Sequence, residues 1–230
     1  MKKIKWMIVV AMLTGFQSNA QTYKIDTSEI SYENKLRPCF HVIYDASAKT
    51  VKKAWDKFFK KNYSVKISGI SLLSNKDIIT GTDVTIASVS DKRMDLYASV
   101  TDVAGGSELK YFMSFGYDFF IGPIEYPKEF EGMKKILNDF SVDFLNEYYA
   151  DEVGSITKKI IGLEKDIKQN NRSIKRNSKK ARKGSAEVAN GYSAKSTSLD
   201  MENEEMRRKI TEFNMEIEVI KVKQAGISRN

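Results

Sequence analysis

Cys39 and His41 are the only thiol and the only imidazole in the chain of 230 residues, and they stand two positions apart. Side chains at i and i+2 of a strand share one face, so the pair has the residue types of a nucleophile and its general base. Those side chains start about 7 Å apart on parallel vectors, and the sequence places no Asn or Asp to orient the ring. We therefore expect a half-buried structural cysteine, a structural or exposed histidine and no catalytic residue.

Other signatures of catalysis and cofactor binding are missing from the sequence. One Cys and one His leave tetrahedral zinc without a credible ligand set. No Gly-Xaa4-Gly-Lys-Ser/Thr loop, dinucleotide glycine pattern or Gly-Xaa-Ser-Xaa-Gly elbow occurs. We expect no cofactor, no metal and no enzymatic activity. An enzyme of unknown class that uses carboxylates of an α+β domain remains the alternative.

A run of basic residues between positions 162 and 184 is the candidate interaction site. Residues 151–230 carry 18 Lys and Arg against 12 Asp and Glu, whereas residues 21–150 carry 17 against 18, so the C-terminal part is where an anionic partner would bind. Tyr192 is the only aromatic residue near the run, so we expect no nucleic acid as partner. The candidate residues are Arg172, Lys175, Arg176, Lys179, Lys180, Arg182 and Lys183.

The first residues have the pattern of a secretory signal. Lys2, Lys3 and Lys5 precede an apolar stretch from Trp6 to Phe16, and small residues end at Ala20. The apolar stretch is about half the ~20 residues that a transmembrane helix needs. The sequence predicts a signal peptide at residues 1–20 and a periplasmic or secreted protein.

Residues 21–150 have the pattern of an α+β domain. A strand at 40–44 precedes a helix capped by Asp45 or Ser47. The apolar stripe of that helix is predicted to face a sheet, as is the stripe of a closing helix that begins at Pro127. The first stripe comprises Val51, Trp55, Phe58 and Phe59, and the second comprises Phe130, Met133, Leu137, Phe140 and Phe144.

Four stretches between the two helices have strand character, and short turns separate them, so an antiparallel meander is expected in the order β-α-β-β-β-β-α. One face of the sheet is expected to be wet. Six aromatic side chains near its end are candidates to line a pocket, although core packing is favoured: Tyr111, Phe112, Phe115, Tyr117, Phe119 and Phe120. The strands are predicted at 65–73, 78–89, 94–103 and 109–121.

Residues 151–230 are predicted to form an antiparallel coiled-coil hairpin, with helices at about 152–182 and 199–225 and a bend at 183–198. Apolar residues follow a 3-4 spacing from Val153 to Ala181 and from Leu199 to Gln224. Pairing residues whose numbers add up to 380 satisfies both seams and places Asn177 opposite Asn203. In that register the basic run faces four carboxylates, which would neutralise over half of it: Asp200, Glu202, Glu204 and Glu205.

The segments AWDKFFKKNYSVKI, MDLYASV and SFGYDFFIG, together with the Lys/Glu-rich hairpin, resemble uncharacterised envelope proteins of Gram-negative bacteria. Those proteins carry a signal peptide, a small α+β domain and a C-terminal coiled coil, and the resemblance implies no functional residue. We expect a non-enzymatic interaction protein whose hairpin is a docking arm or spacer. Its partner would be a protein or another envelope component, with anionic lipid or polysaccharide as the lesser alternative. A structural protein that self-associates through the hairpin is a further alternative.

Overall fold

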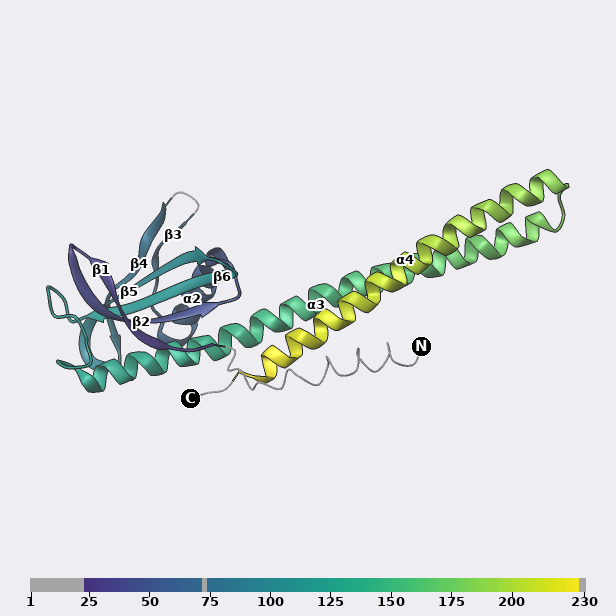
Figure 1. Cartoon of the computed structure of the whole chain (residues 1–230). Coiled ribbons are helices and arrows are strands. Elements are labelled where there is room, and N and C mark those ends of the chain that lie inside the picture. The colour runs from purple at the N-terminus through teal and green to yellow at the C-terminus, as the bar shows by residue number, and fades with distance from the viewer. Residues whose placement is uncertain (1–22, 72–73, 228–230) are drawn as a thin grey trace. The chain divides into compact units, whose positions relative to one another are not determined.

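The computed structural model describes residues 23–71 and 74–227, so the predicted signal peptide lies outside the described residues (Figure 1). The chain divides into two compact units, residues 1–144 with 226–230, and residues 145–225. The fold is α+β with an antiparallel sheet, as predicted. The closing helix of the domain and the first helix of the hairpin were predicted as separate elements, but they are one helix, α3 (Pro127–Ala181).

Six strands form the sheet in the first unit, in the order β1-β2-β6-β5-β4-β3. Helix α2 (Ala48–Tyr63) connects β2 to the far edge, and the meander then brings β6 back beside β2, with Phe40 opposite Tyr111. The strands are β1 (Asp26–Tyr32), β2 (Lys35–Tyr44), β3 (Ser68–Ser71), β4 (Ser74–Ile86), β5 (Ser90–Val103) and β6 (Gly106–Ser114).

Strand β1 is missing from the predicted order, which began with the strand at 40–44. Only Ile30 and Tyr32 mark the apolar positions of β1, so its alternation is weak. The turn that creates the pairing is Glu33-Asn34, whose φ angles are 53° and 59°. Two consecutive left-handed residues give the tight hairpin turn that matches the twist of paired strands.

One face of the sheet packs against α2 and the first turns of α3, as both predicted stripes require. All nine residues of those stripes are buried. The Trp55 ring lies 4.7 Å from Phe140 and 5.2 Å from Tyr111, which joins both helices to the sheet. Ser47 caps α2 by accepting a hydrogen bond from the Thr50 amide, and the Tyr44 hydroxyl lies 2.6 Å from Ser141 Oγ.

The opposite face is not uniformly wet, which corrects the prediction. Cys39, Phe112 and Phe120 form a second buried cluster there. Strand β6 ends at Ser114, not near residue 121, because Gly116 and Tyr117 adopt φ angles of 92° and 49° and turn the chain back. Residues 115–121 therefore fold over the sheet, and the Ile121 amide donates to the Met113 carbonyl.

In the second unit, the later part of α3 lies beside α4 (Ala186–Ala225), as Figure 1 shows. Residues 186–198 are helical, so most of the predicted bend is wrong and only residues 182–185 connect the helices. Every predicted seam position is buried or half-buried. The spacing continues through Ser196, Tyr192 and Ala189, which are also half-buried.

The predicted register of these helices is wrong by one heptad. Asn203 Nδ2 donates to Asn171 Oδ1 at 3.0 Å, and these residue numbers add up to 374. Lys180 lies over the Tyr192 ring, a pair whose numbers add up to 372. Because the bend is shorter than predicted, α4 starts earlier, and each seam residue of α3 meets a residue of α4 that is about seven positions nearer the bend.

An engineered disulfide tests this register. Cysteines at Asn171 and Asn203 should crosslink within one monomer, whereas cysteines at Asn177 and Asn203, the pair predicted from the sequence, should not. The second pair is displaced by six residues, about 9 Å along a helix. Peptide mapping after oxidation identifies the bond, and Asn203→Cys alone controls for pairing with Cys39. Efficient crosslinking of the 177 and 203 pair would contradict the observed register.

Asn203 is fully buried, and its Oδ1 has no hydrogen-bond partner. Replacing Asn203 with Leu should therefore stabilise the second unit by about 1–2 kcal/mol, because an unsatisfied buried amide is removed. Asn214 is exposed, so Asn214→Leu is the matched control and should change the free energy of unfolding by less than about 0.5 kcal/mol. Urea unfolding is followed by far-UV circular dichroism, while Trp55 fluorescence monitors the first unit. A destabilised Asn203→Leu variant would contradict the prediction.

Candidate functional site

Cys39 and His41 share one face of β2, as expected, but they have separate environments. Cys39 is fully buried in the cluster with Phe112 and Phe120, and burial raises the pKa of its thiol to about 11. His41 Nδ1 lies 3.2 Å from a carboxylate oxygen of Glu108 without an aligned hydrogen bond. A protonated, inaccessible thiol is a poor nucleophile, so the arrangement of Cys39 and His41 does not suit a nucleophile and its general base.

The seven candidate interaction residues lie at the end of α3 and in the bend, and all are exposed. Among residues 23–71 and 74–227, none of the seven forms an ion pair. The predicted cross-helix neutralisation is therefore wrong. Glu205 pairs with Arg208 and Lys209 of its own helix, and Glu202 accepts a long hydrogen bond from Asn170.

The heptad difference in register explains the unpaired charge. Pairing through Asn171 and Asn203 places the carboxylates of residues 200–205 opposite positions 169–174, so most of the basic run lies between them and the bend. We define the basic tip as residues 172–199, which contain eight cations and one carboxylate, Glu187. Tyr192 lies between two of these cations, 5.4 Å from Lys180 Nζ and 5.7 Å from Lys195 Nζ. The basic tip is thus a compact surface of net charge +7.

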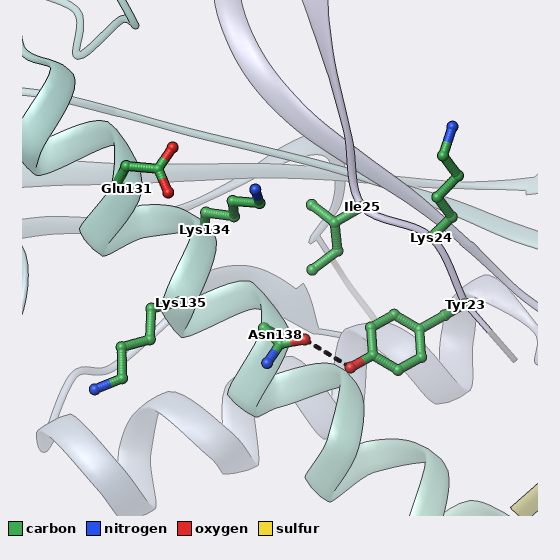
Figure 2. A pocket seen from close by; sticks show the side chains of 7 residues that line it. All are labelled: Tyr23, Lys24, Ile25, Glu131, Lys134, Lys135 and Asn138. Carbon is green, nitrogen blue, oxygen red and sulfur yellow. Dashed lines mark hydrogen bonds between the residues drawn. The ribbon is translucent and has the colours of Figure 1, made fainter. Parts of the chain in front are cut away.

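One pocket of the first unit lies between α3 and residues 23–25, which precede β1, and its volume is about 400 Å³. Figure 2 shows the hydrogen bond between two of its lining residues, which the Tyr23 hydroxyl donates to Asn138 Oδ1 at 2.7 Å. Both residues are buried, so this bond fastens the segment before β1 to α3. Lys24 pairs with Asp26. The other lining residues are Ile25, Glu131, Lys134 and Lys135.

A second pocket lies on the outer face of the sheet and has a volume of about 430 Å³. We call it the aromatic pocket, and it is lined by Tyr32, Glu33, Tyr97, Tyr117, Asp118 and Phe120. Of the six aromatic residues proposed from the sequence, only two line it, and Tyr111 and Phe112 belong to the buried core. Tyr32 was missed because β1 was missed, and Tyr97 because its row of β5 otherwise carries polar residues.

Asp118 at the rim of this pocket accepts hydrogen bonds from Lys35 and Arg37, and the two cations lower the pKa of its carboxyl group. The Arg37 guanidinium also lies 4.0 Å from the centroid of the Phe120 ring. These contacts hold residues 115–121 against β2.

Within residues 23–71 and 74–227, no group of three or more His, Cys, Asp and Glu side chains has the arrangement of a metal site. No helix in those ranges is both long and apolar enough to span a membrane.

Thiol labelling tests the environment of Cys39. At about pH 8, a disulfide reagent should label the native protein on the order of 100-fold more slowly than the unfolded chain, because the thiol is buried and protonated. The folded pKa lies above the ordinary value of 9.0, so this group stabilises the fold below about pH 9 and the contribution is lost as the pH rises toward 11. The unfolding midpoint of the parent should therefore fall as the pH rises over that range, and the Cys39→Ala variant should show a smaller fall. Fast native labelling would contradict the assignment.

Comparisons of the chain with protein-family models, with curated proteins and with solved structures find no match. Two surfaces of the chain have a distinct chemistry, the basic tip and the aromatic pocket.

Proposed function

We propose that the protein is a non-enzymatic interaction protein that is exported to the periplasm or secreted, and that its second unit docks on an anionic partner. The basic tip is the docking site. The observation that carries this proposal is that seven exposed cations of the tip form no ion pair with any described residue. The resemblance to envelope proteins with a signal peptide and a coiled coil agrees with it.

The helices of the second unit are proposed to pack as an antiparallel coiled coil. The 3-4 spacing of half-buried positions on both helices supports this packing, as do the contacts of Lys180 with Tyr192 and of Lys159 with Phe213. Each of these pairs adds up to 372, as one antiparallel register requires. An α-helix rises 1.5 Å per residue, so residues 145–181 make an arm about 55 Å long.

An unpaired cluster of cations favours an anionic surface over a single small anion. The cations occupy two helices and the bend, so they face several directions around the tip. Each Lys or Arg near an anionic lipid surface contributes about 1 kcal/mol, and the attraction falls off within the Debye length, about 8 Å at physiological salt. Cations without intramolecular partners lose no ion pair when they bind.

Binding to vesicles tests the proposal. The mature protein should bind vesicles that contain anionic lipid and should not bind neutral vesicles. Replacing Lys175, Arg176, Lys179 and Lys180 with Gln should weaken binding by on the order of 1,000-fold at low salt, since about 1 kcal/mol per cation, about 4 kcal/mol in all, is removed. Co-sedimentation at several salt concentrations measures the effect. An anionic polysaccharide in parallel distinguishes a lipid partner from a glycan partner.

A matched control removes the same charge elsewhere. Lys49, Lys53, Lys60 and Lys61 are exposed on α2, so their replacement with Gln lowers the net charge equally without touching the tip. This control should bind as the parent does. If both variants lost the same amount of binding, the effect would depend on the net charge of the protein and not on the basic tip. If the parent bound neither the anionic vesicles nor the anionic polysaccharide, the docking site would be refuted.

A further inference from the structure

The aromatic pocket is independent of the basic tip and has a different chemistry. One side of the pocket is a cluster of three rings, with the Tyr32 centroid 5.1 Å from Tyr97 and 6.0 Å from Phe120. These rings are tilted by 38° to 66° to one another, so they present both faces and edges. The fourth ring, Tyr117, is 95% exposed. A volume of about 430 Å³ is within the range that accommodates a small ligand.

The polar part of the lining is acidic. Glu33 and Asp118 are the only charged residues among the six that line the pocket, and no basic residue lines it. The local field has the same sign: after burial, which is the largest cause, the negative charges of Glu33 and Asp95 raise the pKa of Tyr32. Aromatic faces are also negative because of the ring quadrupole. Because Asp118 is already paired with Lys35 and Arg37, the features left to attract a positive ligand are the ring faces and Glu33, which forms no ion pair with the described residues.

The protein already places one of its own cations in this environment. The Arg37 side chain is only 9% exposed, its guanidinium donates a hydrogen bond to Asp118, and it lies 4.0 Å from the centroid of the Phe120 ring. A nearly buried guanidinium is thus compensated by one carboxylate and one ring. The remaining ring surfaces and Glu33 offer the same two kinds of contact to a cation from solution.

The conformation of Tyr117 also favours a ligand in the aromatic pocket. Its φ angle of 49° lies in the left-handed region, which is costly for a large aromatic residue, and its ring is left in water. No ring contact within the described part of the chain compensates for this exposure. A ligand held between Tyr117 and the other three rings would bury the side chain.

We propose that the aromatic pocket binds an organic cation, specifically a methylated ammonium group. The group is compact enough for the pocket, it interacts with ring faces, and its charge complements Glu33. A saccharide would also pack on aromatic rings, and its hydroxyl groups can donate to a carboxylate, but a neutral sugar carries no positive charge for the acidic lining to attract. The ammonium group is either that of a free small molecule or that of a lipid headgroup.

A pair of isosteric ligands separates charge from shape. 3,3-Dimethylbutanol has the shape of choline, but a neutral carbon replaces the quaternary nitrogen. A pocket that is simply apolar would therefore bind both molecules. The full mature chain should bind choline saturably with a dissociation constant in the millimolar range, and the neutral alcohol at least about fivefold more weakly. Chemical-shift changes in the tyrosine and phenylalanine rings report the binding. Phosphatidylcholine vesicles in the same assay distinguish the headgroup from the free ligand.

Variants at exposed positions locate the site without affecting the fold. Tyr117→Leu keeps an apolar side chain but removes the ring, and Glu33→Gln removes the charge; each should weaken choline binding at least about threefold. Phe119 belongs to the same turn, is 60% exposed and does not line the pocket, so Phe119→Leu is the matched control for Tyr117. Glu125→Gln is the control for Glu33.

The four-Gln variant of the basic tip should bind choline as the parent does, which separates this site from the proposed docking site.

Three results would overturn the proposal. Equal affinity for choline and the neutral alcohol would make the site simply apolar. Preferential binding of a methyl glycoside that depends on Tyr117 would assign it to saccharides. Absence of saturable binding, or a choline affinity that the Tyr117 and Glu33 variants leave unchanged, would show that the pocket is not a cation site.

Discussion

The four residues between α3 and α4 determine which side chains of the two helices face each other. Helical packing with a 3-4 repeat is satisfied equally well by registers that differ by seven residues, so the repeat alone leaves the choice open. The bend at residues 182–185 selects the register in which Asn203 bonds to Asn171. In that register the carboxylates at 200–205 lie beyond most of the basic run. The lack of ion-pair partners for the candidate cations of the basic tip is therefore a consequence of the length of the bend.

The sheet of the first unit depends on a comparable local event. Gly116 and Tyr117 turn the chain after β6, and residues 115–121 then cover part of the face that would otherwise be solvated. Arg37 holds this segment in place through Asp118 and Phe120. The same contacts that complete the second hydrophobic cluster leave Tyr117 exposed beside a pocket. The turn at Gly116 and Tyr117 therefore contributes both to the packing on the sheet and to the lining of the aromatic pocket.

The two proposed sites have opposite charge and lie in different units. The basic tip carries cations without partners and suits an extended anionic surface, whereas the aromatic pocket has acidic and aromatic walls and suits a single small cation. Neither site requires a nucleophile, and the one thiol of the chain is protonated and inaccessible. Both proposals describe recognition of a partner or ligand and involve no catalytic step.

The sequence by itself determined the class of the fold, the cap of α2, the buried stripes of α2 and α3, and the seam positions of the second unit. These follow from local spacing, because a helix or strand places its apolar residues at fixed intervals whatever it packs against. Strand β1, the return of residues 115–121 and the register of α4 were decided only by tertiary structure. Each depends on a turn or on contacts between distant residues, and a weakly alternating strand or a seven-residue repeat fits more than one such arrangement. The candidate cations were therefore identifiable from the sequence, but their lack of partners was not.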